Sequence, residues 1–469
     1  MKVEQIYTGC LAQGTYYIIS NGEAAIIDPL REVNPYLEKL EQDGVKLKYI
    51  LETHFHADFV SGHIDLQKKT GAQIVYGPNA NPEFEALIAE DNQIFEIGNI
   101  KIKVLHTPGH TIESTTYLLI DEKGKDYAIF SGDTLFLGDV GRPDLAQKAA
   151  ELTKEDLAGY LYDSLQNKIM PLADDVIVYP AHGAGSACGK NMMKETVDTL
   201  GHQKEINYAL NQPNKESFIH AVLDGLQEPP AYFGMNVTMN KKGYESFDKV
   251  LKQGLTKLNP KEFETVANTI DAIILDTRNA NDFSKGFVPQ SINIGIDGDF
   301  APWVGSLLVD VQQPLLVVCD ENREEEVITR LSRVGFDNVL GYLKGGIKAW
   351  QDEGFEIDKV DRMSTEGFAN KVIINEDKII DIRKESEYEA EHIENAYSRP
   401  LNKINNWISE INPIEHFYLH CAGGYRSMIA ASILQARGYR NFTEVDGGFN
   451  AIKNTEVSKS NFVCQSKTI

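Results

Sequence analysis

The stretch of sequence that says most about this chain is Thr53-His54-Phe55-His56-Ala57-Asp58-Phe59. It follows an apolar run at 49–51, so we expect a loop at the end of a strand, where a rigid sheet presents functional side chains. Two imidazoles and a carboxylate on one loop are typical metal ligands. The phenyl ring of Phe59 cannot coordinate a metal, so the loop predicts a metal site in which position 59 takes no part.

Further ligand-type side chains follow other expected strands: His110 after 100–105, Asp133 after 127–130 and His182 after 176–179. Because such strand ends can meet at one edge of a sheet sandwich, these residues can converge with His54 and His56 on one point. The pattern therefore predicts one metal site. His63 and His106 are expected to remain outside it, on a helix surface and at a strand end respectively.

The donor types leave the identity of the metal open. Two histidines and one carboxylate on one face of a metal leave positions for a substrate and O₂, as in non-heme Fe(II) oxygenases. Three histidines with a bound water would instead suit zinc-dependent hydrolysis. Imidazole binds both metals, so the residues alone do not choose between them.

Residues 1–190 resemble the metallo-β-lactamase superfamily and, within it, the iron-dependent persulfide dioxygenases. The motifs that carry this resemblance are the loop at 53–59, Thr-Pro-Gly-His at 107–110 and Ser-Gly-Asp at 131–133. Hydrolytic members usually have another histidine where this chain has Phe59, and that histidine helps to hold a second metal. The resemblance therefore implies an αββα sandwich with one Fe(II) per chain. It places the iron on His54, His110 and Asp133.

The same resemblance implies supporting roles for other residues. His56, Asp58 and His182 become groups that orient the ligands or bind water. The segments 138–144 and 183–190 also resemble persulfide dioxygenases fused to rhodanese units. Arg142 could hold a substrate carboxylate, with a surface ion pair as the alternative. Cys188 could carry a sulfur near the iron, with a buried structural thiol as the alternative.

The C-terminal half contains an internal repeat. An apolar strand followed by Asp-x-Arg occurs at 273–278 and again at 378–383. Each copy later has an apolar strand that ends in a cysteine, Cys319 in the first and Cys421 in the second. Strands that alternate with helical stretches predict two α/β units with parallel sheets, of about 100 residues each.

The loop at 421–427 reads Cys-Ala-Gly-Gly-Tyr-Arg-Ser and opens an expected helix. Backbone N–H groups, the helix N-terminus and Arg426 favour negative charge there, so we expect Cys421 to be nucleophilic. The pattern resembles the rhodanese active site, which implies that Cys421 carries a sulfane sulfur. Cys319 is followed by carboxylates instead of glycines, so the first repeat is expected to be a degenerate rhodanese unit with a scaffolding role.

These patterns divide the chain into three expected domains. Residues 1–258 form the dioxygenase-like domain with a helical extension at 189–258, residues 259–358 the degenerate rhodanese-like domain, and residues 365–460 the rhodanese domain. The expected fold class is α/β multidomain, an αββα sandwich followed by two parallel-sheet units. A homo-oligomer, a dimer or tetramer, is expected, with the extension as a plausible dimer element.

Composition limits the partners. The chain has 469 residues and a formal charge of −23, a field that repels nucleic acid and anionic membranes. No apolar stretch reaches the roughly 18 residues needed to span a bilayer. The start lacks the apolar core of a signal peptide, and the five cysteines include no C-x-x-C pair. We expect a cytoplasmic protein without nucleic-acid or membrane partners.

The resemblance implies an Fe(II)-dependent dioxygenase that oxidises low-molecular-weight persulfides with O₂ to sulfite in sulfide detoxification. Sulfur transfer at Cys421 would form or use thiosulfate. The main alternative is a zinc-dependent thioester hydrolase that resembles hydroxyacylglutathione hydrolases. A third possibility is a sulfide-responsive carrier with an inactive metal domain. The thiol that carries the persulfide and the direction of sulfur transfer stay open.

Overall fold

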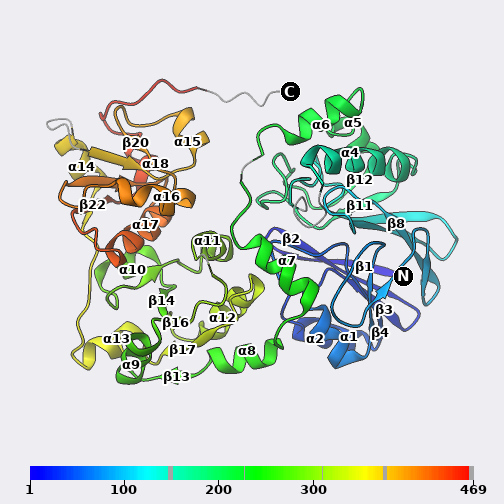
Figure 1. Cartoon of the computed structure of the whole chain (residues 1–469), viewed down its shortest axis with the longest axis horizontal. Coiled ribbons are helices and arrows are strands. Elements are labelled where there is room, and N and C mark those ends of the chain that lie inside the picture. Colours follow the sequence, from blue (N-terminus) through cyan, green and yellow to red (C-terminus); the bar gives the residue numbers. More distant parts are fainter. Residues whose placement is uncertain (146–151, 227, 309, 373–377, 464–469) are drawn as a thin grey trace. The chain divides into compact units, whose positions relative to one another are not determined.

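The computed structural model describes residues 1–145, 152–226, 228–308, 310–372 and 378–463. The chain forms two compact units (Figure 1), one of Met1–Phe247 with Ser332–Gly335 and one of Asp248–Leu331 with Phe336–Ile469. Within the described ranges, no helix combines the length and the apolarity needed to span a bilayer. Each unit is organised around its own sheets.

The first unit contains two six-stranded sheets. One has, in spatial order, β1 (Lys2–Thr8), β2 (Gln13–Ser20), β3 (Glu23–Ile27), β4 (Lys46–Leu51), β5 (Gln73–Tyr76) and β6 (Leu87–Ile88). The other has β12 (Asp198–Thr199), β11 (Ile177–Pro180), β10 (Asp126–Gly132), β9 (Thr115–Ile120), β8 (Ile100–His106) and β7 (Ile94–Ile97). Both sheets contribute to one apolar core, with Tyr16 and Leu51 from one and Val104 and Phe130 from the other. The two sheets are therefore the layers of a sandwich.

Helices cover the outer faces of the sandwich. They are α1 (Asn34–Asp43) and α2 (His63–Thr70) on one sheet, and α4 (Lys154–Ser164), the π-helical turn η1 (Leu165–Ile169), α5 (Leu200–Ile206) and α6 (Lys215–Leu223) on the other. Successive strand residues point to opposite faces, so Tyr16 enters the inner core and Tyr17 the outer one. Two further helices follow along the chain, α7 (Phe233–Lys242) in this unit and α8 (Phe247–Gly254), which apart from Phe247 belongs to the second unit. The predicted αββα sandwich is confirmed.

The loops that carry the ligand-type residues meet at one end of this sandwich. The Thr115 N–H donates to the Thr53 carbonyl at 2.9 Å, and the Ala181 N–H donates to the Gly132 carbonyl at 3.1 Å. Gly132 has a φ of +53°, and a Cβ there would lie 2.7 Å from the Cβ of Thr53. Glycine at this position therefore permits both the turn and the close approach of the two loops.

The second unit contains two five-stranded sheets with the same strand order. The first has β13 (Lys257–Leu258), β17 (Val339–Leu343), β16 (Leu315–Val318), β14 (Ile273–Asp276) and β15 (Ile292–Asn293). The second has β18 (Arg362–Met363), β22 (Phe442–Val445), β21 (Phe417–His420), β19 (Lys378–Asp381) and β20 (Tyr397–Ser398). All neighbouring strands in both sheets are parallel. The two predicted α/β units with parallel sheets are confirmed.

Helices connect the strands in each repeat. The first repeat has α9 (Pro260–Ile270), α10 (Ala280–Lys285), α11 (Phe300–Leu307), α12 (Glu324–Arg333) and α13 (Gly346–Asp352). The second has α14 (Thr365–Val372), α15 (Glu385–Ala390), η2 (Leu401–Lys403), α16 (Ile404–Trp407), η3 (Ile408–Glu410), α17 (Tyr425–Ala436) and α18 (Gly448–Ile452). Such crossover helices are what parallel strands require.

The repeated Asp-x-Arg motif forms the same buried ion pair in both repeats. Arg278 Nη2 lies 2.5 Å from Asp276 Oδ2, and Arg383 Nη2 lies 2.6 Å from Asp381 Oδ2. Each guanidinium also donates to a backbone carbonyl of the following helical segment. The motif therefore ties the end of a strand to the segment that follows it.

Candidate metal centre and reactive-cysteine pocket

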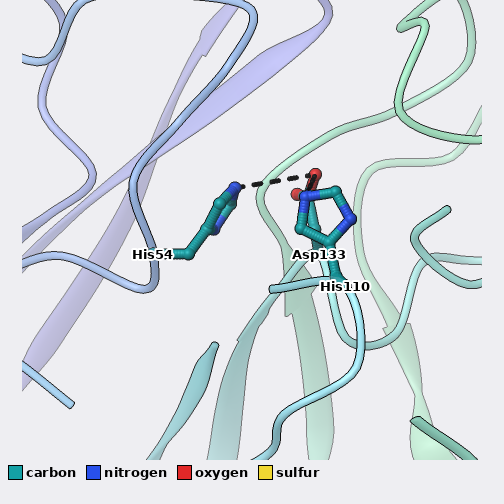
Figure 2. Close-up of side chains that lie close together, drawn as sticks. All are labelled: His54, His110 and Asp133. Atoms are coloured by element: carbon teal, nitrogen blue, oxygen red, sulfur yellow. Dashed lines mark ion pairs between the residues drawn. The ribbon is translucent and has the colours of Figure 1, made fainter. Parts of the chain in front are cut away.

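The structure brings His54, His110 and Asp133 together from the loops after β4, β8 and β10 (Figure 2). One donor atom from each lies within 4.8 Å of the others. His54 Nε2 is 3.9 Å and His110 Nε2 is 3.4 Å from Asp133 Oδ2. All three side chains are buried. Metal ligands about 2.1 Å from one ion have donor atoms spaced in this way.

The chemistry of the three residues fits a divalent metal. Asp133 Oδ2 is buried and has no hydrogen-bond partner among the residues that the structure describes. Burial and the neighbouring His56 lower the pKa of His54 well below its usual value, so its ring is neutral and can donate a lone pair. Burial opposes ionisation of Asp133, but the imidazoles of His182, His110 and His54 outweigh it and hold its pKa below the usual range. The set is therefore two imidazoles, with that of His54 neutral, and one carboxylate.

Hydrogen bonds fix which nitrogen of each histidine faces the centre. The Thr53 hydroxyl donates to Asp28 Oδ2 at 2.8 Å, so its oxygen accepts from His54 Nδ1 at 3.0 Å. His110 Nδ1 lies 2.8 Å from the Arg142 carbonyl, which can only accept. Both Nδ1 atoms therefore carry the proton, and both Nε2 atoms keep a lone pair for a metal.

His182 lies beside this centre and bridges two carboxylates. Its Nδ1 is 2.8 Å from Asp133 Oδ1, and its Nε2 is 2.8 Å from Asp58 Oδ2. Burial alone would lower the pKa of His182, but Asp133 and Asp58 raise it well above its usual value. The contact between His182 Nδ1 and Asp133 Oδ1 fixes the orientation of Asp133.

His56 turns away from the three converging residues. Its Nε2 lies 3.0 Å from Asp28 Oδ1 and 3.7 Å from Glu52 Oε2. The buried ring of Phe59 packs against it, with ring centroids 4.3 Å apart. Asp28 and Glu52 were not identified from the sequence. Each directly follows a buried apolar strand, so the rule that found Asp133 would have found them too.

His63 corrects one sequence expectation. It was expected on a helix surface, but it is the first residue of α2 and is fully buried. Its Nδ1 lies 3.6 Å from Glu52 Oε1, and burial lowers its pKa to about 3. The α2 helix packs its N-terminal end into the unit, so a position that looked exposed is enclosed. His106 lies at the end of β8, as expected.

Arg142 is committed to contacts within the protein. Its buried guanidinium forms a two-point ion pair at 2.7 Å with Asp144, which is half-buried. Its peptide N–H donates to the Cys188 carbonyl at 3.0 Å. Arg142 thus connects the segment of Cys188 to His110, which bonds its carbonyl.

Cys188 lies with Asp58 and His182 in a second buried cluster, with one donor atom of each within 4.8 Å of the others. Burial, and then the charges of Asp58 and Asp133, raise the pKa of the Cys188 thiol well above its usual value. The structure therefore brings this cysteine to the metal centre, as a protonated thiol.

Cys421 lies at the end of β21, at the start of the loop that opens α17. The Gly424 N–H donates to its sulfur at 3.1 Å, and the Ser427 hydroxyl lies 3.4 Å from it. The residue borders a pocket of about 480 Å³. The residues that line it are Asp299, Trp303, Lys384, Glu387, Cys421, Ala422, Gly423, Tyr425 and Arg426.

Arg426 borders this pocket but does not act alone. Its Nη1 and Nη2 lie 2.6 and 2.8 Å from the two carboxylate oxygens of Glu387. The cation expected beside the thiol is therefore paired with the carboxylate of Glu387, which was not predicted as a site residue.

In the first repeat, burial and then Glu324, Asp276 and Asp320 raise the pKa of Cys319 to about 12. That environment keeps Cys319 protonated.

Comparisons with known proteins agree with this arrangement. A model of the metallo-beta-lactamase superfamily matches residues 9–182. A solved structure named as a metallo-beta-lactamase from Staphylococcus aureus is 31% identical, covers 73% of this chain and 98% of its own, and superposes with a TM-score of 0.65. The chain belongs to the metallo-beta-lactamase superfamily.

This superfamily member also carries two rhodanese-like domains, matched at residues 259–353 and 366–455. A hydroxyacylglutathione hydrolase of Pelagibacter ubique is 32% identical over 37% of this chain and 68% of its own length. A probable hydroxyacylglutathione hydrolase of Schizosaccharomyces pombe is 32% identical over 34% of this chain. The chain spans 59% of the length of the latter relative. Both likenesses cover only a minor share of this chain.

Proposed function

We propose that the chain is an Fe(II)-dependent persulfide dioxygenase coupled to sulfur transfer at Cys421. The observation that carries the proposal is the set of donors at the centre, two imidazoles and one carboxylate, with His56 turned away. This set suits a non-heme iron that binds substrate and O₂ at its open positions. The overall reaction is RSSH + O₂ + H₂O → RSH + SO₃²⁻ + 2H⁺, where RSSH is a low-molecular-weight persulfide.

The residues of the chain would have distinct parts in this reaction. His54, His110 and Asp133 would hold the Fe(II), which when bound supplies the ability to activate O₂. Thr53 and the Arg142 carbonyl keep the two imidazoles in the required tautomer. His182, whose Nδ1 lies 2.8 Å from Asp133 Oδ1, would keep that carboxylate in its orientation.

Cys421 would handle the sulfane sulfur. The Gly424 N–H bonded to its sulfur and the N-terminus of α17 favour a thiolate or a charged persulfide there. The thiolate would take sulfur as Cys–S–S⁻ and pass it to sulfite, forming thiosulfate, or would work in the opposite direction. Carrying both sites on one chain raises the effective concentration of the shared sulfur compounds.

Oxygen consumption tests the proposal. The protein, loaded anaerobically with Fe(II), should consume O₂ when a panel of persulfides, including glutathione persulfide, is added, and sulfite should appear in equal amount. Asp133→Asn, which removes the charged ligand, should abolish this uptake while Cys421 still accepts sulfur. No oxygen uptake with any persulfide by protein that contains one iron per chain would refute the proposal.

A zinc-dependent thioester hydrolase is the second candidate, favoured by the names of the curated relatives. Phe59 opposes it, because hydrolytic relatives of this type use a histidine there to hold a second metal. Metal analysis of the purified protein separates the two. About one iron per chain supports oxygenation, whereas about two zinc ions with turnover of S-lactoylglutathione would establish hydrolysis.

A further inference from the structure

The first repeat, whose own cysteine is held protonated, borders the pocket of Cys421. Within the second unit, Asp299 and Trp303 line that pocket, and both belong to the segment that begins α11 of the first repeat. The two repeats are joined next to this segment. The Asn293 N–H donates to the Ser432 hydroxyl of α17 at 2.9 Å. The first repeat therefore forms one side of the reactive pocket.

Tyr425, from the Cys421 loop, is held by the first repeat. Its hydroxyl donates to the Gly295 carbonyl at 2.7 Å. A Cβ at Gly298 would lie 2.4 Å from the ring carbon Cζ of Tyr425, so the ring packs directly on this glycine. The loop is therefore positioned relative to Asp299, the residue that follows Gly298.

The charges of the pocket separate into a paired set and an unpaired set. Arg426 and Glu387 neutralise each other through two short contacts. Asp299 and Lys384 are exposed and form no ion pair with any residue in the described ranges. The half-buried indole of Trp303 adds an apolar face beside Asp299. In this pocket Asp299 attracts a cation, whereas Lys384 attracts an anion such as thiosulfate.

The volume of the pocket also exceeds what an inorganic sulfur anion requires. At about 480 Å³ it is within the range of sites for small organic molecules. We propose that Asp299 and Trp303 bind the body of a low-molecular-weight thiol that carries an ammonium group, and that this thiol exchanges sulfane sulfur with Cys421. The inference rests on the proposed sulfur transfer at Cys421 and names the class of its organic partner.

The transfer balances without an oxidant. Cys421 is charged by a sulfane donor, Cys421–S⁻ + S–SO₃²⁻ → Cys421–S–S⁻ + SO₃²⁻. The thiol then attacks the outer sulfur, Cys421–S–S⁻ + RSH → Cys421–S⁻ + RSSH. One S–S bond forms as another breaks, and the proton of the thiol leaves with the product. Asp299 would hold the ammonium group of R, and the indole of Trp303 would contact its carbon chain.

Two thiols of equal size test the choice of partner. Cysteamine has an ammonium group where 2-mercaptoethanol has a hydroxyl group. Sulfite release from thiosulfate is measured with each thiol, at equal concentrations of its thiolate form. The wild type should show a KM about two- to fivefold lower for cysteamine, the size of an exposed ion pair. Asp299→Asn should remove this preference, and Trp303→Ala should raise KM for both thiols.

Asp297→Asn is the matched control. Asp297 lies two positions before Asp299, but it is paired with Arg323 at 2.8 Å and does not line the pocket. It should keep the preference for cysteamine. Equal KM values in the wild type, or a preference that survives Asp299→Asn, would overturn the inference. Thiocyanate formation from thiosulfate and cyanide by the wild type separately tests sulfur transfer, and its absence would count against the proposed function instead.

Discussion

The tautomers of the two converging histidines depend on one hydroxyl and one carbonyl. Thr53 lies between His54 and Asp28, and it donates to the carboxylate while it accepts from the imidazole. A side chain that cannot do both leaves His54 Nδ1–H without its acceptor. The ring could then rotate or exchange its proton between the nitrogens, and fewer molecules would present Nε2 to a metal.

Thr53→Val keeps the shape of this side chain and removes the hydroxyl. We expect the affinity for Fe(II) or Co(II) to fall about 10- to 100-fold, as for other partners that orient metal ligands. Competition with a chelator of known affinity measures the affinity of each variant for the metal. Thr53→Ser retains the hydroxyl and should bind nearly as well as the wild type. Unchanged affinity in the valine variant would show that the hydroxyl does not orient His54.

The two cysteines at strand ends should differ in reactivity. Burial and nearby carboxylates raise the pKa of Cys319 to about 12, so below that pH it is almost entirely protonated. Only the thiolate reacts with iodoacetamide. Its alkylation rate should therefore rise about tenfold per pH unit from pH 8 to 11, without a plateau.

Mass spectrometry of alkylated peptides gives both rates in one sample. Cys421, beside an open pocket and bonded by the Gly424 N–H, should react faster than Cys319 at pH 8. A plateau for Cys319 near pH 9 would contradict the environment described for it. In that case the carboxylates around it would not be controlling its ionisation.

In the first unit, the end of β10 is tightly constrained beside the candidate metal centre. Gly132 combines a φ of +53° with a close approach to Thr53. A residue with a side chain at this position would be destabilised by the left-handed backbone conformation. Its Cβ would also clash with Thr53 in the loop that carries His54. Because Asp133 directly follows Gly132, such a substitution would lower the stability of the fold and also disturb the candidate metal centre.

Gly132→Ala should destabilise the protein by more than the roughly 1–2 kcal/mol of left-handed backbone alone. Gly124→Ala is the matched control, because Gly124 also has a positive φ of +81° but nothing within 4 Å of an added Cβ. Thermal unfolding of both variants separates backbone strain from the clash. Equal losses would mean that the two loops can move apart, and metal binding by Gly132→Ala would then be retained.

In the molecule as a whole, one chain holds both the candidate metal centre and the pocket of Cys421. The metal centre belongs to the first unit and Cys421 to the second. If they act in sequence, products should change when either is removed. Under the proposed function, sulfite would be the product of the first reaction and the sulfur acceptor or leaving group of the second.

Cys421→Ser should therefore leave oxygen uptake by the iron-loaded protein largely intact and abolish sulfur transfer. With a persulfide in excess, the wild type should convert part of its sulfite to thiosulfate, whereas the variant should accumulate sulfite alone. Chromatography of the reaction products measures sulfite and thiosulfate. Thiosulfate in undiminished yield from Cys421→Ser would show that sulfur transfer takes place elsewhere, with Cys188 as the next candidate.

Local pattern was sufficient for the parallel-sheet repeats and for a metal site built from residues at strand ends. The αββα class and the choice of His54, His110 and Asp133 among those residues came from the resemblance to the metallo-β-lactamase superfamily. The apolar strands that precede His54, His110 and Asp133 can be predicted from the sequence, because strand periodicity and turn residues are local properties. The repeat could also be predicted, because both copies contain the Asp-x-Arg motif and an apolar strand followed by a cysteine. The resulting sandwich and parallel sheets are those that the structure shows.

Packing between distant segments decided the rest. What lies opposite each side chain decides that His56 turns to Asp28 and Glu52 and that His63 is enclosed. The same is true of the ion pair between Arg142 and Asp144. The same holds for Asp299 and Trp303, which come from one repeat and border the cysteine of the other. A side chain's neighbours across the fold leave no periodic signal in the chain, because burial and pairing are settled only when separate elements meet.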